Sequence, residues 1–262
     1  MATLAYPRHF HALDADDVIS GLRAPHKRLP GALVDRDARR IEATLLADNA
    51  MNIAHQVGPL ARVIELGGGA AARTLVDALD RPREYASIDL RDKELPVPQH
   101  AFATTLLYLP HNLIGAMEPS DARGTLSRFA QLAGPDRLLL VGADATRDEV
   151  GELDDHAGRD ALEKLNQTRH ATFDLDAFQQ RAAWNAASSR VELAVVSTAR
   201  QVVQLDDEVI ALQAGEPIEL AHSYKHTPAA MQAILVGAGW RLRQVFTSRL
   251  RPVRLWLCEP MR

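Results

Sequence analysis

The sequence predicts an α/β protein with a doubly wound, mostly parallel sheet, and three observations carry this prediction. Apolar runs of strand length alternate with helical segments between residues 57 and 148. One such run, RVIEL, leads into Gly67, Gly68 and Gly69 and then into a helical segment. A second run, YASIDL, brings Asp89 to its end about twenty residues later. This order is that of a βαβ unit, in which the two strands are parallel.

The elements of the first half follow from the spacing of their apolar residues. Residues 35–57 place Ile41, Leu45 and Ile53 at helical intervals with charges opposite, which predicts an amphipathic helix beside the sheet. The pattern then predicts strands at 62–66, 85–90, 102–109 and 137–143, with helices at 71–79 and 121–133. Residues 1–56 are therefore expected to form an N-terminal helical cover, although the first thirty carry only one short predicted helix, near 14–22.

The second half predicts a subdomain inserted into this core. Helices are expected at 148–167 and 174–185, followed by short alternating segments that suit an antiparallel sheet. The tail predicts a helix that ends at Gly239 and two strands that complete the first sheet. We therefore expect a core of residues 57–148 and 223–262, with an α+β insertion at 149–222 near the carboxyl ends of the core strands, where such sheets bind ligands.

Composition narrows the classes of partner. Hydrophobic residues make up 47% of the 262, which suffices for a large core, and a net charge of −4 argues against a nucleic-acid partner. Cys258 is the only cysteine, which excludes an internal disulfide and favours a reducing compartment. The sequence has no apolar run of membrane-spanning length, and His9 and His11 have no accompanying ligand cluster, so no metal is expected. We expect a cytoplasmic protein with a small-molecule substrate and leave its oligomeric state open.

The glycine turn predicts a nucleoside cofactor. Glycines let the backbone approach a ligand where a Cβ would clash, and an acid after the next strand, here Asp89, can accept hydrogen bonds from ribose hydroxyls. The spacing G-x-G-x-x-G that holds a pyrophosphate is missing, because three alanines follow the glycines. The turn therefore favours S-adenosylmethionine (SAM), which has no pyrophosphate.

Several longer segments resemble the histidine Nα-methyltransferases of ergothioneine biosynthesis. They are LLLVGADATRDEVGELDDHAGRDALEKLN, FDLDAFQQRAAWNAASSRVELAVVS and AGEPIELAHSYKH. The resemblance spans roughly residues 57–250 and implies a Rossmann-like class I methyltransferase core with an inserted substrate-binding subdomain. It also implies that Glu65, Gly67, Gly68 and Gly69 hold the methionine end of SAM and that Asp89 holds its ribose.

The chain differs from this family at the positions that bind histidine in the family. Ala116 stands where the family has an Asn that holds the substrate amine, and Leu153 stands where it has a Tyr before a D-D pair. Ala221 replaces the Glu that recognises the imidazole, while Ser223 and its neighbours are kept. A Tyr-rich family segment near the N-terminus is also missing. We therefore expect an acceptor other than histidine.

Four residues are candidates for handling that acceptor. Asn112 and His111 follow a predicted central strand, where loops carry chemistry, and Asn112 offers an amide oxygen in place of the missing one. Glu219 is expected to share a strand face with Ala221 and Ser223 by the two-residue period, which would bring its carboxylate into the same pocket. The first hypothesis is methyl transfer to a small amine or amino-acid-like metabolite.

Two alternatives remain open from the sequence. One is a SAM-consuming enzyme of the cyclase or aminocarboxypropyl type, like those that form azetidine-2-carboxylate. The other is a protein that binds SAM or another ligand without turnover. Only about fifteen residues separate Asp89 from the strand around Leu106, too few for the usual helix, strand and connection, so the adenine side of the site is expected to be built differently.

Overall fold

The computed structural model describes residues 36–67, 70–90, 92, 94–147 and 157–261. They form two compact units, the first made of residues 36–146 and 225–261 and the second of residues 147 and 157–224. The predictions for the first thirty residues, and the positions of Gly68, Gly69 and Leu153, lie outside the described residues.

The first unit contains a six-stranded sheet with the strand order β10-β11-β4-β3-β1-β2. Its strands are β1 (Ala61–Leu66), β2 (Glu84–Ile88), β3 (Thr104–Leu109), β4 (Arg137–Asp144), β10 (Trp240–Thr247) and β11 (Val253–Pro260). Parallel pairs join β2 to β1, β1 to β3 and β3 to β4, whereas β11 runs antiparallel to both of its neighbours. The α/β prediction with a mostly parallel sheet is confirmed.

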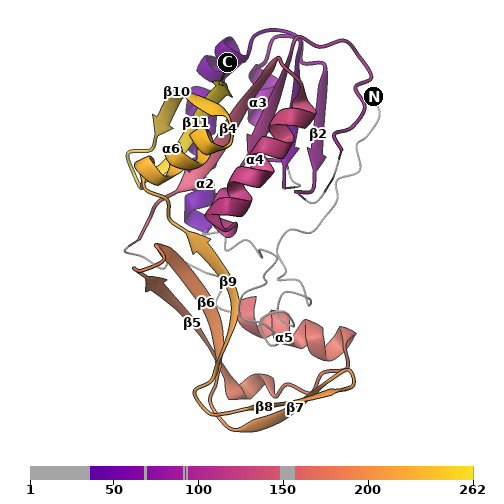
Figure 1. Ribbon diagram of the computed structural model, residues 1–262, viewed down its shortest axis with the longest axis vertical. Helices are drawn as coiled ribbons and strands as arrows, with labels where there is room; N and C mark the ends of the chain where they lie inside the picture. Colours follow the sequence, from indigo (N-terminus) through magenta and orange to yellow (C-terminus); the bar gives the residue numbers. More distant parts are fainter. Residues whose placement is uncertain (1–35, 68–69, 91, 93, 148–156, 262) are drawn as a thin grey trace. The chain divides into compact units, whose positions relative to one another are not determined.

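Helices cover the two faces of this sheet. They are α2 (Arg36–Val57), α3 (Arg73–Ala78), α4 (Pro119–Ala133) and α6 (Pro228–Gly237). Figure 1 shows α4 and α6 in front of the sheet, while α2 lies behind it and packs against α3 and β11. Among the helices that the structure describes, none is long and apolar enough to cross a membrane.

Local signals explain where these helices begin and end. Helix α2 carries Asp37 in its first turn and is followed by Gly58 at φ +84°, a left-handed conformation that glycine adopts readily. Helix α6 begins after Thr227, whose hydroxyl accepts a hydrogen bond from the backbone N–H of Ala230 at 3.1 Å. Each cap satisfies backbone groups that the helix itself leaves open.

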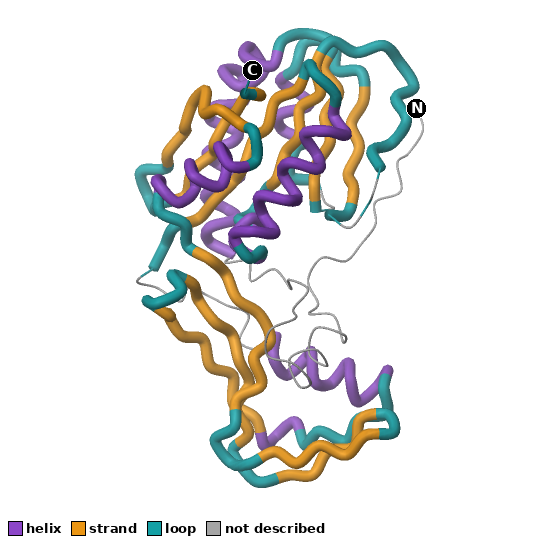
Figure 2. Tube along the Cα trace, in the orientation of Figure 1, coloured by secondary structure: helices purple, strands orange, loops and turns teal. Residues whose placement is uncertain are grey.

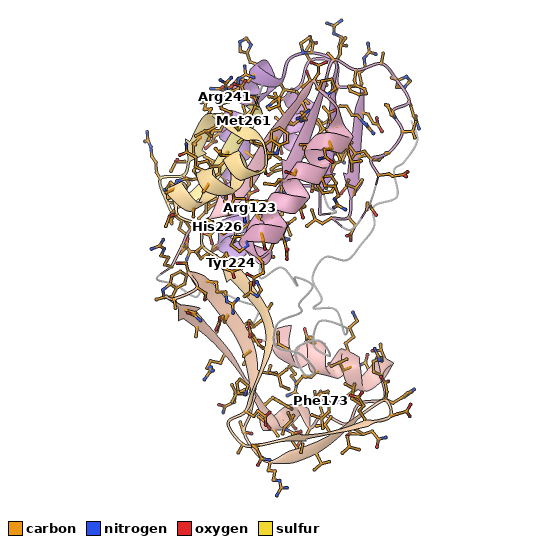
Figure 3. The ribbon with its side chains drawn as sticks, viewed as in Figure 1. Arg123, Phe173, Tyr224, His226, Arg241 and Met261 are labelled. Atoms are coloured by element: carbon orange, nitrogen blue, oxygen red, sulfur yellow. The ribbon has the colours of Figure 1, made fainter. Side chains whose placement is uncertain are left out.

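The second unit has its own hydrophobic core. It combines α5 (Ala157–Thr168) with a three-stranded antiparallel sheet and a two-stranded ribbon, as Figure 2 shows. The sheet strands are β5 (Phe178–Asn185), β6 (Arg190–Ser197) and β9 (Pro217–Tyr224), and the ribbon strands are β7 (Gln201–Leu205) and β8 (Glu208–Leu212). Phe173, labelled in Figure 3, meets the ring of Phe178 edge-on at 5.9 Å in this core.

The helix predicted at 174–185 is wrong, because residues 178–185 form β5. This strand pairs with β6 along its whole length, from Phe178 opposite Ser197 to Asn185 opposite Arg190. The Asn185 side chain closes the hairpin by accepting hydrogen bonds from two backbone N–H groups in the turn. Pairing with β6 thus overrides the helix propensity of Gln, Arg and Ala in this segment.

Candidate active site

The carboxyl ends of the four parallel strands meet at one edge of the six-stranded sheet. After β1 the chain passes to β2 on one side, and β3 then pairs with β1 on the other side. Such a reversal of strand order opens a crevice for ligands at the carboxyl ends. Gly67, Asp89, His111 and Asp144 all lie at this end of the sheet, because each ends or follows one of the four strands. We call this end, where the parallel strands finish, the ligand edge.

The turn after β1 is shaped by Glu65, whose side chain is buried. Its two carboxylate oxygens accept hydrogen bonds from the backbone N–H groups of Ala71 and Ala72, at 3.1 and 2.9 Å, and from the Tyr85 hydroxyl at 2.8 Å. These bonds tie the start of α3 back to β1. Direct contact of Glu65 with a cofactor stays a prediction.

Gly67 allows a close approach that no other residue would permit. Its φ is +107°, and its N–H donates to the Ile88 carbonyl at 2.8 Å. A Cβ on Gly67 would lie 2.2 Å from Cδ1 of Leu113, which comes from the segment after β3. The missing side chain of Gly67 therefore lets the segment after β3 pack against the turn after β1.

Asp89 directly follows β2, the edge strand, and is half-buried. Its backbone N–H donates to the Asp92 carboxylate at 2.9 Å. The described residues between Asp89 and β3 form no helix or strand, and the guanidinium groups of Arg128 and Arg62 donate to the carbonyls of Leu90 and Pro96. The short connection predicted from the sequence is thus tied to the core by arginine side chains.

His111 and Asn112 form a left-handed turn after β3, with φ values of +59° and +52°. Asn112 is buried and links neighbouring strands, since its N–H donates to the Gly142 carbonyl and its amide oxygen accepts from the Asp144 N–H, both at 3.1 Å. The short 3-10 helix η1 (Leu113–Ala116) follows, and all four of its residues are buried and non-polar. The amide oxygen of Asn112 therefore already accepts a structural hydrogen bond from β4.

A buried carboxyl group from α2 reaches the same turn. Glu42 accepts hydrogen bonds from the Tyr108 hydroxyl at 2.8 Å and from the His111 N–H at 3.0 Å, and its Oε1 lies 3.8 Å from Nδ1 of His111. Gly142 makes room for it, because a Cβ there would lie 2.3 Å from the carboxyl carbon. Burial raises the pKa of the Glu42 carboxyl to about 7, against the lowering effect of its hydrogen bonds and of Arg39.

Asp144 contacts both chain segments that lead to and from the second unit. Its carboxylate accepts a hydrogen bond from the Thr146 N–H at 2.9 Å and forms a buried ion pair with Lys225. Thr146 and Lys225 are the residues of the first unit at which the chain leaves and returns. Asp144 thus holds both connections at the ligand edge.

In the second unit, a β-bulge separates Glu219 from Ser223. Ser223 lies opposite Val191 and Ala221 opposite Leu193, but the register then shifts so that Glu219 lies opposite Ala194. The extra residue, Leu220, reverses the alternation of side chains. Ala221 and Ser223 therefore share one face, and the prediction that Glu219 lies on that face is wrong.

Glu219 belongs to a polar face of this sheet. Its carboxylate lies 3.6 Å from the guanidinium of Arg190, which donates to Glu192 at 2.7 Å and lies 3.4 Å from the Tyr224 hydroxyl. Tyr224, labelled in Figure 3, ends β9 and meets the ring of His222 edge-on. This face is organised around the Arg190 cation, whereas Ala221 on the other face belongs to the hydrophobic core.

A family model described as "Histidine-specific methyltransferase, SAM-dependent" matches residues 96–260 of the chain. The chain belongs to this family. It is a SAM-dependent methyltransferase, and the predicted cofactor and the predicted family resemblance are both confirmed.

Curated relatives of this methyltransferase are similar over most of its length. A histidine N-alpha-methyltransferase of Mycobacterium tuberculosis is 27% identical over 85% of this chain and 87% of its own. One from Mycolicibacterium smegmatis is 29% identical over 88% of this chain and 90% of its own. The solved CcbJ methyltransferase of Streptomyces caelestis aligns with a TM-score of 0.44 at 10% identity, covering 83% of this chain and 90% of that one.

The residues at the ligand edge of this methyltransferase fit SAM. Asp89 is half-buried and directly follows β2, the strand next to β1, where a carboxylate can accept hydrogen bonds from ribose hydroxyls. When bound, SAM supplies a methyl group on a positively charged sulfur. The protein's part is to orient a neutral nucleophile in line with that carbon and to exclude water.

The structure brings His111 and Asn112 together at this edge and places Glu219 and Ser223 on opposite faces of one strand in the other unit. Sequence reasoning missed Glu42. A signal was present, because Glu42 interrupts the apolar stripe of its helix between Ala38 and Leu46, at intervals of four residues. A carboxylate in a buried stripe needs partners, which marks it as a candidate.

Proposed function

We propose that this methyltransferase transfers a methyl group to the nitrogen of a small amine or amino-acid-like metabolite other than histidine. N-methylation is the chemistry named for its two curated relatives, which methylate the α-nitrogen of histidine. The acceptor is expected to differ because this chain lacks the side chains that grip histidine in the resembling family.

Position 116 carries this proposal. The family pattern has an Asn there to hold the substrate amine, whereas Ala116 offers only a methyl group and is 5% exposed. The three preceding residues of η1 are also buried and non-polar, so this segment supplies no side-chain hydrogen-bond acceptor. Ala221, at the position of the imidazole-binding Glu, belongs to the hydrophobic core of the second unit. Both positions thus favour an acceptor with a different recognition chemistry.

The test is incubation of the purified protein with SAM and a panel of small amines and amino acids that includes histidine, read by mass spectrometry. We expect S-adenosylhomocysteine together with a methylated amine other than histidine. Methylation of histidine alone would overturn the choice of acceptor. Methylthioadenosine would indicate cyclisation or aminocarboxypropyl transfer, and calorimetric binding without either product would indicate a protein without turnover.

Cofactor binding is tested separately with Asp89→Ala. Loss of a charged hydrogen-bond acceptor is expected to weaken SAM binding about ten- to a hundredfold by calorimetry. Asp80→Ala is the matched control, because Asp80 is an exposed acid on the amino side of β2 and is expected to leave affinity unchanged. Equal affinities of the wild type and both variants would contradict the assignment of Asp89.

Cys258 is the only cysteine of the chain and its thiol is buried, so we also propose that the enzyme works in the reducing cytoplasm.

A further inference from the structure

A buried carboxyl group lies beside the imidazole of His111 at the ligand edge. Glu42 comes from α2 and His111 from the turn after β3, and the two meet through two contacts. The carboxylate accepts the His111 N–H at 3.0 Å, and its Oε1 lies 3.8 Å from the ring nitrogen Nδ1. The first contact fixes the backbone of the turn, and the second places negative charge beside the ring.

Part of the His111 side chain is exposed, although Nδ1 is buried. Nδ1 is buried against Glu42, yet the His111 side chain as a whole is 19% exposed. Its accessible surface therefore lies on atoms other than Nδ1. Since His111 follows β3 at the carboxyl edge of the sheet, this surface belongs to the ligand side of the molecule.

We propose that Glu42 is a positioning residue that holds His111 with Nδ1 toward the carboxylate, so that Nε2 accepts a proton from the ammonium group of the methyl acceptor. The inference rests on the proposed function, because it requires an amine acceptor. A carboxylate beside one ring nitrogen favours the tautomer with the proton on that nitrogen and stabilises the imidazolium that forms.

The proton and electron balance is as follows. The acceptor ammonium loses one proton to Nε2, which makes His111 an imidazolium and leaves a lone pair on the acceptor nitrogen. That lone pair forms the new bond to the methyl carbon as the carbon–sulfur bond breaks, and the electron pair of the broken bond stays on sulfur. The products are a methylated ammonium and neutral S-adenosylhomocysteine, and His111 returns its proton to water.

The charged groups around Glu42 decide when it is ionised. Arg39 on its own helix and the hydrogen bonds from Tyr108 and His111 favour the carboxylate, while burial and the nearby charge of Asp144 oppose it. The resulting pKa of about 7 means that Glu42 gains its charge as the pH rises through neutrality. The effect of Glu42 on His111 is therefore expected to grow over the same range.

The first experiment uses nitrogen-15 NMR of the full-length protein without ligand. In the wild type we expect His111 to carry its proton on Nδ1 when neutral. In Glu42→Gln, which keeps the shape but removes the charge, the midpoint of the His111 titration is expected to fall by about half a pH unit or more. An unchanged titration would overturn the proposal, whatever the acceptor proves to be.

The second experiment measures kcat/KM against pH with the acceptor found by mass spectrometry. We expect kcat/KM of the wild type to rise near pH 7. Glu42→Gln is expected to abolish this rise and to lower kcat/KM about tenfold above neutral pH. His111→Asn removes the imidazole while tolerating the left-handed backbone, and is expected to lower kcat/KM about a hundredfold. In the double variant the Glu42 change should add nothing further, since Glu42 acts through His111.

Additive losses in the double variant would overturn the proposal, because Glu42 would then act independently of His111. Tyr108→Phe serves as the structural control: it removes one hydrogen bond to Glu42 but leaves the carboxylate and the imidazole in place. It is expected to keep the rise with pH. Absence of methyl transfer to any amine would refute the proposed function, while the NMR titration would still decide the pairing of Glu42 with His111.

Discussion

At the scale of single residues, the ligand edge depends on two glycines that admit other side chains. Leu113 packs where a Cβ of Gly67 would lie, and the Glu42 carboxyl packs where a Cβ of Gly142 would lie. Both contacts join segments that are distant in sequence. Gly67 and Gly142 therefore shape the packing of the first unit.

Gly67→Ala is expected to destabilise the protein by about 2–3 kcal/mol, because the left-handed backbone disfavours a Cβ and the buried Leu113 must move. Denaturant unfolding measures this loss, and calorimetry should show weaker SAM binding. Gly58→Ala is the matched control, since Gly58 has φ +84° and nothing within 4 Å of a Cβ. Gly58→Ala should cost only about 1 kcal/mol. Equal losses in the two variants would show that the Leu113 side chain moves aside at no energetic cost.

At the scale of elements, Asp144 at the end of β4 connects the segments that enter and leave the second unit. Its ion pair with Lys225 is almost fully buried, with side-chain exposures of 3% and 7%. The same carboxylate accepts the Thr146 N–H. A buried charge that loses its partner is costly, so both connections depend on this carboxylate.

Asp144→Asn keeps a hydrogen-bond acceptor for Thr146 but leaves the Lys225 ammonium without its counter-charge. We expect a loss of about 3–5 kcal/mol in the free energy of unfolding. Glu259→Gln is the control, because its partner Arg241 is 66% exposed and such surface pairs contribute at most about 1 kcal/mol. If the two variants lose the same stability, the pair at Asp144 is no stronger than a surface pair.

At the scale of the whole molecule, buried titratable groups give stability a dependence on pH. The pKa of Glu42 is raised from 4.5 to about 7 in the folded protein, mainly by burial. The folded state then holds a proton that the unfolded state has released between these values. This contribution is fully present below pH 4.5 and is lost as the pH rises through 7. Burial lowers the pKa of His226, which contributes with the opposite sign.

Glu42→Gln isolates the contribution of Glu42, because both proteins share His226 and every other group. Relative to the variant, the wild type is expected to lose about 3 kcal/mol of stability between pH 4.5 and 7, at roughly 1.4 kcal/mol per pH unit. Urea unfolding at a series of pH values measures the difference. A difference that stays constant across this range would show that Glu42 titrates normally in the folded state.

Local periodicity predicted most of the first unit correctly. The apolar spacing over 35–57 became α2, and the predicted core strands became β1, β2, β3 and β4 with shifts of one or two residues at their ends. The helix predicted at 174–185 failed because hydrogen bonding to β6, which lies later in the sequence, outweighed the local preference. The predicted face of Glu219 failed because one extra residue in β9 reversed the alternation.

The sequence by itself determined the βαβ core, the glycine turn and the class of cofactor, because these depend on neighbouring residues and on spacings of a few positions. Only the tertiary structure decided which groups meet at the ligand edge. Glu42 binds Tyr108 and His111 across 66 and 69 residues of chain, a pairing that no local spacing encodes. It arises because α2 packs behind the sheet and Gly142 leaves room for the carboxyl group.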